Sequence, residues 1–209
     1  MATKRILDYE KKYQDLNYIC GIDEAGRGPL AGPVSCAAVI MPREPFIEDI
    51  DDSKKLSEAK REELYEIIIK TAIAYNIVFI DHITIDKINI LNATKLGMEQ
   101  AAKGLKIVPD IILIDAVKGL DLPCKSESII KGDEQSYNIA AASILAKVAR
   151  DRYMREMDKI YPYYDFKNCK GYATPNHLEA LKKWGSCPIH RQSFLTHLEV
   201  AGKEIIERL

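Results

Sequence analysis

Two adjacent carboxylates, Asp23 and Glu24, end an apolar stretch and lead into the glycine-rich turn Gly26-Arg27-Gly28. Carboxylates are rarely buried unless they are paired with a cation or bound to a metal ion. Glycines leave the backbone amides of such a turn open to an anion, and the arginine adds a positive charge. This arrangement predicts a place where a metal ion and a phosphate are held together.

Two further carboxylates have positions typical of metal ligands. Asp115 comes at the exit of the apolar stretch 111–114, and Asp133 stands in the turn before an alanine-rich segment. Phosphodiester hydrolysis needs an activated water, a stabilised leaving oxygen and shielding of the phosphate charge, which two divalent ions about 4 Å apart supply. Carboxylate oxygens are the ligands that Mg²⁺ and Mn²⁺ prefer. The sequence therefore predicts a Mg²⁺ or Mn²⁺ site for phosphodiester hydrolysis.

Each of these assignments has an alternative. Adjacent strand residues face opposite ways, so Asp23 and Glu24 both bind a metal only where the strand end is irregular, as the nearby glycines favour. Asp115 also fits the cap of a turn, and Asp133 fits the N-cap of a helix. Asp151 competes as a fourth ligand, but its place in mid-helix between two arginines favours an ion pair.

The elements that must position these residues alternate between strands and helices. β-Branched and apolar stretches predict strands, whereas N-cap residues, apolar spacings of three and four, and terminal glycines predict helices. The predicted strands are 18–24, 34–41, 75–80, 111–114 and 128–130, and the predicted helices run from 57, from 84 to about 103, and over 137–160, 175–185 and 194–209. This order predicts an α/β fold with a mixed sheet flanked by helices, in which a small helical cap, 173–209, packs on a catalytic domain, 1–172.

Composition narrows the class of protein. Of the 209 residues, 47% are hydrophobic and 29% are charged, as in soluble globular proteins. The longest uncharged run, 28–42, is too short and too rich in glycine and proline to span a membrane, and the N-terminus lacks the apolar core of a signal peptide. We therefore expect a cytoplasmic protein without membrane contact. The five cysteines form no CxxC pair, which predicts reduced thiols rather than disulfides or zinc ligands.

The charge pattern gives no general sign of nucleic-acid binding, because the net charge is −1. The segment 167–191 holds five basic residues against one acidic residue, and on charge alone we interpret it as a solvated helix face. The four histidines have no metal-ligand spacing and no serine or cysteine partner pattern, so we assign them no catalytic role.

A set of short blocks follows a fixed order along the chain. Besides 21–34, the blocks are Asp52-Ser53-Lys54-Lys55-Leu56, Asn92-Ala93-Thr94-Lys95-Leu96, Ile114-Asp115, Lys131-Gly132-Asp133, 140–148 and Lys170-Gly171-Tyr172-Ala173-Thr174. In content and order they resemble ribonuclease HII, the type 2 ribonuclease H family, over about residues 17–195. The resemblance implies a ribonuclease H-like fold and hydrolysis of the RNA strand in RNA–DNA hybrids. It also implies cleavage on the 5′ side of single ribonucleotides embedded in duplex DNA.

The resemblance also implies roles for individual residues. It assigns the metal-binding and catalytic set as Asp23, Glu24, Asp115 and Asp133. It assigns Gly26, Arg27 and Gly28 to the ribonucleotide 2′-hydroxyl, the group that distinguishes RNA from DNA. Tyr172 is expected to stack beside the sugar that follows the ribonucleotide. Asn168 and Cys169 depart from the family pattern, since more basic residues are expected there.

Lys54 and Asn92, with Lys55 and Lys95 beside them, are candidate phosphate contacts, although a solvated lysine is the ordinary alternative. Other classes fit the sequence less well. A cluster of carboxylates beside phosphates disfavours a non-catalytic nucleic-acid-binding module. A nucleotide binder lacks its Walker pattern, and the related ribonuclease HIII usually carries a sizeable extra N-terminal domain. We expect a monomer that acts on RNA–DNA hybrids and on ribonucleotide-containing duplex DNA.

Overall fold

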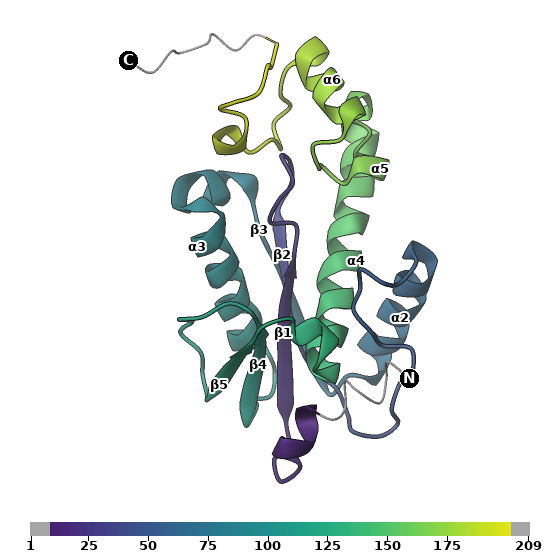
Figure 1. Ribbon diagram of the computed structural model, residues 1–209, viewed down its shortest axis with the longest axis vertical. Coiled ribbons are helices and arrows are strands. Elements are labelled where there is room, and N and C mark those ends of the chain that lie inside the picture. The colour runs from purple at the N-terminus through teal and green to yellow at the C-terminus, as the bar shows by residue number, and fades with distance from the viewer. Residues whose placement is uncertain (1–8, 202–209) are drawn as a thin grey trace.

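The computed structural model describes residues 9–201 and contains a five-stranded mixed sheet (Figure 1). The strands are β1 (Ile19–Ala25), β2 (Val34–Ile40), β3 (Ala74–Ile80), β4 (Ile111–Asp115) and β5 (Ser126–Ile129). Their order is β3-β2-β1-β4-β5, with antiparallel pairing from β1 to β3 and parallel pairing from β1 to β5. The last strand is 126–129 rather than the predicted 128–130, because residues 126–129 pair with β4 whereas Ile130 is exposed.

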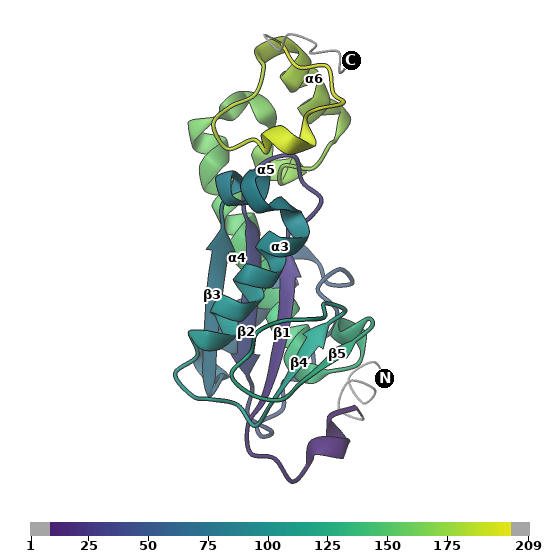
Figure 2. The same cartoon turned by 90° about the vertical axis from the view of Figure 1, so that its left-hand side faces the viewer.

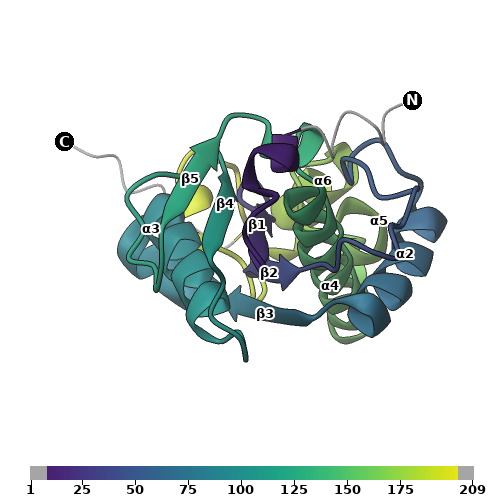
Figure 3. The same ribbon diagram turned by 90° about the horizontal axis from the view of Figure 1, so that it is seen from below.

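Helices cover both faces of this sheet. The α-helices are α2 (Glu58–Thr71), α3 (His82–Lys103), α4 (Tyr137–Ile160), α5 (Phe166–Cys169) and α6 (Pro175–Trp184), and the 3₁₀ helices are η1 (Lys11–Tyr13), η2 (Gly132–Glu134), η3 (Pro162–Tyr164) and η4 (Gln192–Phe194). Figure 2 shows α3 in front of the sheet, and Figure 3 shows α3 on one face with α4 and α2 on the other. The α/β prediction is therefore confirmed. Within residues 9–201, we find no helix whose length and apolar character would let it cross a membrane.

The side chains of β2 explain why a helical layer forms on each face. Every residue of β2 is buried, so the strand lies in the middle of the core. Cys36 and Ala38 belong to the hydrophobic cluster that includes α3, whereas Ala37 and Val39 belong to the cluster that includes α2 and α4. Successive side chains of a strand face opposite ways, and here both faces are apolar.

The first turn of α4 approaches β1 more closely than any side chain at Gly21 would permit. A Cβ atom there would lie 2.0 Å from the carbonyl carbon of Asn138, far inside a real contact distance. Ser136 caps this end of α4, because its side chain accepts a hydrogen bond from the Ile139 amide. The close approach fixes the beginning of α4 against β1, two residues before Asp23.

The chain after α4 forms a cap at one end of the sheet, as Figures 1 and 2 show. The cap contains η3, α5, α6 and η4, and its fully buried Phe166 and Leu181 belong to a hydrophobic cluster distinct from those around the sheet. Leu30 and Ala31, from the turn between β1 and β2, join this cluster. The expected helical cap is present beside the sheet, and the domain division at residues 172 and 173 stays a prediction.

The predicted helix 194–209 is wrong over the residues that the structure describes. The 3₁₀ helix η4 ends at Phe194, and residues 195–201 continue without helix. Leu195 is buried in the cap, and the amide of Ala201 donates a hydrogen bond to the carbonyl of Leu181 at 3.0 Å. These tertiary contacts with α6 override the local helical pattern. The remainder of that prediction, 202–209, lies outside the described residues.

Replacing Gly21 with alanine tests the contact between β1 and α4. We expect the free energy of unfolding to fall by about 3 kcal/mol or more, because the added methyl group must push strand and helix apart. In a chain of this size that lowers the Tm by about 6–12 °C, which calorimetry measures. Gly28→Ala is the control, since its Cβ atom would lie 3.6 Å from Tyr172, an ordinary contact. Equal melting temperatures for the Gly21→Ala variant and the wild type would contradict this account.

Candidate active site

Pairing between β1 and β4 brings two of the predicted carboxylates together. Ile22 is opposite Ile114 in the parallel ladder, so the next residues, Asp23 within β1 and Asp115 at the end of β4, lie side by side. Asp133 comes from η2, the turn that leads into α4. One carboxylate oxygen from each of these three aspartates lies within 4.8 Å of the other two. Three of the four predicted ligands therefore form one cluster.

The environment of the cluster opposes negative charge. Asp23 is 5% exposed, and its Oδ1 accepts a hydrogen bond from the Glu24 amide at 2.7 Å. Burial raises the pKa of Asp23 well above its usual value, and the charges of Glu24 and Asp115 raise it further. Burial also raises the pKa of Asp115, although the amide of Gly132 donates to its Oδ1 at 2.7 Å. Buried carboxylates that repel one another take up protons unless a cation neutralises them.

Glu24 lies beside this cluster rather than in it. The strand stays regular to Ala25, so Glu24 pairs with Cys36 on the face opposite to Asp23. Its Oε2 atom is buried without a hydrogen-bond partner. Burial raises the pKa of Glu24, and the positive charge of Arg27 opposes that shift. An unpaired buried acceptor whose charge interacts with that of Asp115 is what a further cation ligand looks like before the ion binds.

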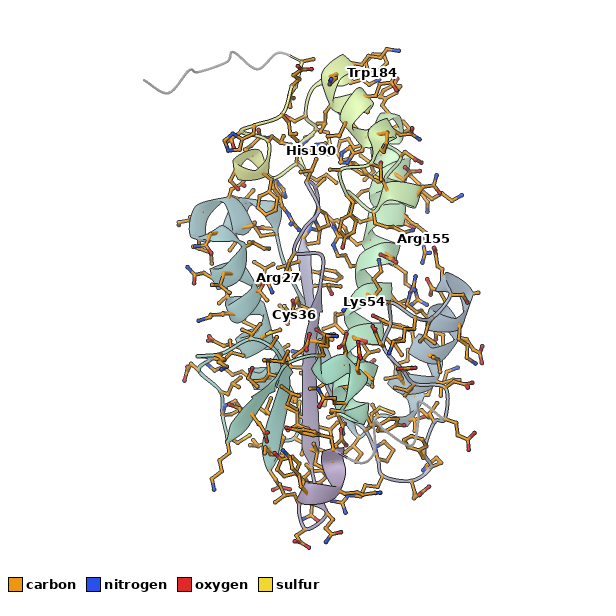
Figure 4. The ribbon with its side chains drawn as sticks, in the orientation of Figure 1. Arg27, Cys36, Lys54, Arg155, Trp184 and His190 are labelled. Carbon is orange, nitrogen blue, oxygen red and sulfur yellow. The ribbon has the colours of Figure 1, made fainter. Side chains whose placement is uncertain are left out.

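Lys54 supplies a positive charge to the cluster. Its Nζ atom donates to Oδ2 of Asp133 at 3.0 Å, although the lysine side chain is 78% exposed. This hydrogen bond raises the pKa of Lys54. Figure 4 shows Lys54 and Arg27 in the same middle part of the molecule, near the end of β1. The sequence predicted that Lys54 contacts a phosphate. In the structure its partner is a carboxylate of the cluster.

The donor set fits a small divalent cation. Mg²⁺ binds hard oxygen ligands at about 2.1 Å, so its ligands lie about 3–4 Å from one another. The oxygens of Asp23, Asp115 and Asp133 are within 4.8 Å of one another, and the orphaned Oε2 of Glu24 offers a further oxygen. The site contains no sulfur or imidazole ligand among these four residues, which favours Mg²⁺ or Mn²⁺ over zinc.

The predicted substrate-binding residues meet next to these carboxylates. Arg27 and Gly28 are exposed, and Nη1 of Arg27 lies 3.4 Å from Oε1 of Glu24. A Cβ atom on Gly28 would lie 3.6 Å from Cε1 of Tyr172, so the tyrosine ring stands beside the glycine-rich turn. Tyr172 is 43% exposed. The structure thus brings the turn and the tyrosine together from segments about 140 residues apart in sequence.

The sequence analysis missed Arg191, which holds the glycine-rich turn from the cap. Its fully buried guanidinium donates to the carbonyls of Gly26 at 2.6 Å, Arg27 at 2.8 Å and Gly32 at 2.9 Å. Burial lowers the pKa of Arg191 to about 9, with a further contribution from the charge of Arg150. The basic segment 167–191 was interpreted as a solvated helix face. Its charge pattern gave no indication that this arginine is buried.

Arg150 of α4 forms a second link of the same kind. Its side chain donates to the carbonyls of Ala31 at 3.0 Å, Pro33 at 2.9 Å and Lys170 at 2.9 Å. It therefore ties the turn between β1 and β2 to the loop that carries Tyr172. Within residues 9–201, neither Arg150 nor Arg191 forms a salt bridge, so backbone carbonyls accept their hydrogen bonds, and the more distant charges of Asp151 and Asp86 also favour the charged guanidinium groups.

Other predicted residues do not join the site. Asn92 is exposed on α3, where its amide bonds to Oδ1 of Asn89, and it makes no hydrogen bond to the carboxylates in the described part of the chain. Asp151 is buried and pairs with Lys147 at 2.7 Å, so the expected ion pair is confirmed with a different partner from the flanking arginines. The five cysteines are free, as predicted.

A mixed sheet with clustered carboxylates at the ends of its central strands defines a metal-dependent nuclease with a ribonuclease H-like fold. The family model described as Ribonuclease HII matches residues 20–197. The chain therefore belongs to the ribonuclease HII family, and it is a metal-dependent endoribonuclease.

Individual relatives agree with this assignment. The chain is 57% identical to the ribonuclease HII of Acetivibrio thermocellus over 89% of this chain and 73% of the relative. It is 56% identical to that of Caldicellulosiruptor bescii, over 87% of this chain and 88% of the relative. Among solved structures, the ribonuclease H2 of Pyrococcus horikoshii matches with a TM-score of 0.73 and 27% identity, over 84% of this chain and 93% of that chain.

Asp23→Asn tests whether the cluster binds metal. In chelator we expect the variant to melt about 2–4 °C above the wild type, because it loses one of several mutually repelling buried charges. Mg²⁺ at a hundredfold its Kd stabilises the wild type by about 2.7 kcal/mol, or about 5–11 °C, and we expect the variant to lose most of this shift.

Asp151→Asn is the matched control for this melting experiment. Its carboxylate is also buried, but it is paired with Lys147 and lies outside the cluster. We expect it to lower the Tm in chelator and to keep the response to Mg²⁺. A full metal-induced shift in Asp23→Asn would show that Asp23 is not a ligand.

Proposed function

We propose that this member of the ribonuclease HII family, which acts on the RNA of RNA–DNA hybrids, also cleaves duplex DNA on the 5′ side of a single embedded ribonucleotide. The observation that carries the proposal is a juxtaposition. Three carboxylates converge within 4.8 Å, and the exposed backbone at Arg27 and Gly28 lies next to the ring of Tyr172. The proposed cleavage site thus lies beside a backbone segment and an aromatic ring that can contact a single nucleotide.

For the chemical step we propose hydrolysis with two Mg²⁺ or Mn²⁺ ions. Such ions supply an activated water, a stabilised leaving oxygen and shielding of the phosphate charge. Asp23 and Asp115 stand on strands and would form the more rigid part of the ligand set, with Glu24 beside them. Asp133 stands in a 3₁₀ turn and would complete the second ion's site. Lys54, released from Asp133 when a cation takes its place, would be free to contact a phosphate.

For recognition we propose that the backbone of Gly26, Arg27 and Gly28 contacts the 2′-hydroxyl. This group both donates and accepts hydrogen bonds, and it is absent from deoxyribose. Arg191 and Arg150 support the proposal, because their hydrogen bonds to backbone carbonyls hold the loop between β1 and β2 in place. Tyr172 would stack beside the next sugar, where the strand turns from RNA to DNA. A phosphate contact by Asn92 and the monomeric state stay predictions.

A non-catalytic nucleic-acid-binding module is the alternative. Binding to phosphates is favoured by positive charge and opposed by clustered carboxylates. The three aspartates, two of them with raised pKa values, would repel a nucleic acid unless a cation neutralised them. The geometry therefore favours a metal-dependent nuclease over a binding module.

Cleavage of a labelled duplex that contains one ribonucleotide tests the proposed function. We expect a single cut on the 5′ side of the ribonucleotide in Mg²⁺ or Mn²⁺, no cut in chelator, and a loss of about 100-fold or more in Asp23→Asn, the range for removal of one catalytic electrostatic partner. In Asp133→Asn, higher metal concentration or Mn²⁺ is expected to restore part of the rate, since only the second ion is weakened. Binding of this duplex without any cut, in either metal, would favour the binding module.

Tyr172→Ala tests the sensing of the RNA-to-DNA junction. Stacking is worth about 1–3 kcal/mol by alanine substitution, so we expect the ratio of junction cleavage to all-RNA cleavage to fall by about 5- to 150-fold. Kinetics on the two substrates measure this ratio. Tyr163→Ala is the matched control, because Tyr163 is also exposed on the cap but stacks on Trp184 rather than beside the glycine-rich turn. An unchanged ratio in Tyr172→Ala would refute the stacking role.

A further inference from the structure

Two buried histidines in the cap lie end to end behind Tyr172. His177 of α6 is fully buried and His190 is 1% exposed, and their Nε2 atoms are 3.0 Å apart. On the far side of the pair, Nδ1 of His190 lies 2.9 Å from the amide nitrogen of Cys187. On the near side, Nδ1 of His177 lies 2.8 Å from the carbonyl oxygen of Tyr172. The pair thus spans the cap from Cys187 to the tyrosine loop.

The partners of the two rings define where each proton resides. An amide nitrogen can only donate, so Nδ1 of His190 accepts from Cys187 and its proton is on Nε2. That proton is donated to Nε2 of His177, which leaves the proton of His177 on Nδ1. A carbonyl can only accept, and Nδ1 of His177 does face the Tyr172 carbonyl. All three hydrogen bonds agree on one direction, from Cys187 to Tyr172.

An additional proton would break a link of this chain. On His177 it would make Nε2 a donor facing the donor Nε2 of His190, although Nδ1 would still donate to the Tyr172 carbonyl. On His190 it would make Nδ1 a donor facing the Cys187 amide, with the Cys187 carbonyl at 3.2 Å as its acceptor. The complete chain, from Cys187 to Tyr172, therefore requires two neutral histidines.

The surroundings also favour the neutral pair. Tyr164 and Phe166 pack their rings against both histidines. Burial lowers the pKa of His177, and burial together with His177 lowers the pKa of His190 to about 4. The titratable groups that face the pair are Asp165, which favours the charged form of His177, His82 of α3, which disfavours that of His190, and the neutral Cys187 and Tyr164.

The pair connects to the substrate side through the tyrosine loop. The Tyr172 carbonyl also accepts from the Thr174 amide at 2.8 Å, and the Tyr172 amide donates to Cys169 at 2.9 Å, so the carbonyl fixes a tight turn. The neighbouring Gly171 carbonyl accepts from the amide of Leu30 in the glycine-rich turn at 2.8 Å. A change in the Tyr172 carbonyl's hydrogen bonds therefore moves the ring that stands beside Gly28.

We propose that His177 and His190 are positioning residues for substrate discrimination: as a neutral, directional hydrogen-bond chain they hold Tyr172 in its stacking position. This inference rests on the proposed role of Tyr172 at the RNA-to-DNA junction. Its consequence is that the preference for junctions depends on the Nδ1 donor of His177, while cleavage itself continues without it. Burial lowers the pKa of both histidines, that of His190 to about 4, so the pair is neutral and the chain is intact at pH 7.

Nitrogen-15 NMR of the imidazoles tests the chain without reference to activity. In the metal-free protein at pH 7.5 we expect His177 to carry its proton on Nδ1 and His190 on Nε2, with a scalar coupling between the two Nε2 nuclei across the hydrogen bond. The backbone signals of Tyr172 are expected to shift in His177→Leu and to keep their wild-type positions in His177→Asn, whose amide replaces the donor. Opposite tautomers, or Tyr172 signals that do not respond to His177→Leu, would overturn the proposal.

The ratio of junction cleavage to all-RNA cleavage tests the consequence. Both substrates use the same carboxylates and ions, so any general effect on the chemistry cancels in the ratio. At pH 7.5 we expect His177→Leu to lower the ratio by about fivefold or more, the lower limit of a stacking contribution.

His177→Asn separates positioning from simple support of the fold. Its amide nitrogen replaces the Nδ1 donor to Tyr172, so we expect the variant to keep the high ratio of the wild type. This rescue keeps the test decisive if His177→Leu fails to fold. The exposed His197→Asn is the control and is expected to keep the wild-type ratio.

The outcomes distinguish the two proposals. A folded His177→Leu with the wild-type ratio, or a His177→Asn variant with the low ratio, overturns the role of the histidines while the proposed function stands. A wild type that does not cut at single ribonucleotides at pH 7.5 overturns the proposed function, and with it the part of this inference that concerns junctions. The NMR measurement then still decides whether the histidine chain positions Tyr172.

Discussion

Repulsion among three carboxylates held close together, two of them buried and one half-buried, is the constraint on which the rest of the structure depends. Asp23, Asp115 and Asp133 keep oxygens within 4.8 Å, although each negative charge disfavours the next. A flexible chain would relieve this repulsion by moving the groups apart. Parallel pairing of β1 with β4 and the glycine contact of β1 with α4 prevent such movement. Affinity for a cation is therefore a property of the rigid sheet and helix as much as of the acidic side chains.

The second requirement is that the residues that recognise the substrate keep a fixed position relative to this cluster. The glycine-rich turn follows the last residue of β1, Ala25, so its beginning is fixed by the same strand that carries Asp23. Its far side is fixed by the cap, through the backbone carbonyls that Arg150 and Arg191 hold. The cap thus acts as a support for a loop of the sheet, and its hydrophobic cluster includes Leu30 and Ala31 from that loop.

The sequence predicted the parts of the molecule that local rules govern. Apolar runs that end in acidic residues identified β1 and β4. Parallel pairing of these two strands then brings Asp23 beside Asp115. The two-residue period of a strand also explains why Glu24 stands apart, since no irregularity rotates it towards Asp23. What local rules miss depends on tertiary contacts. Residues 195–201 lose their helical pattern to hydrogen bonds and packing with the cap, and the burial of Arg191 has no signature in a run of basic residues.

The carbonyl contacts of Arg191 have a consequence for how specificity is encoded. In a trans peptide the N–H points opposite to the C=O, so holding the carbonyls of Gly26 and Arg27 inward turns the amides of Arg27 and Gly28 outward. The exposed face of the turn is then a row of peptide donors whose orientation does not depend on the side chains of the turn. The residue that fixes this orientation, Arg191, is 164 residues away in the sequence. The exposed position 27 could therefore change its side chain without losing the peptide face that the loop presents, whereas Gly26 could not, because a Cβ atom there would lie 1.9 Å from Nε of Arg150.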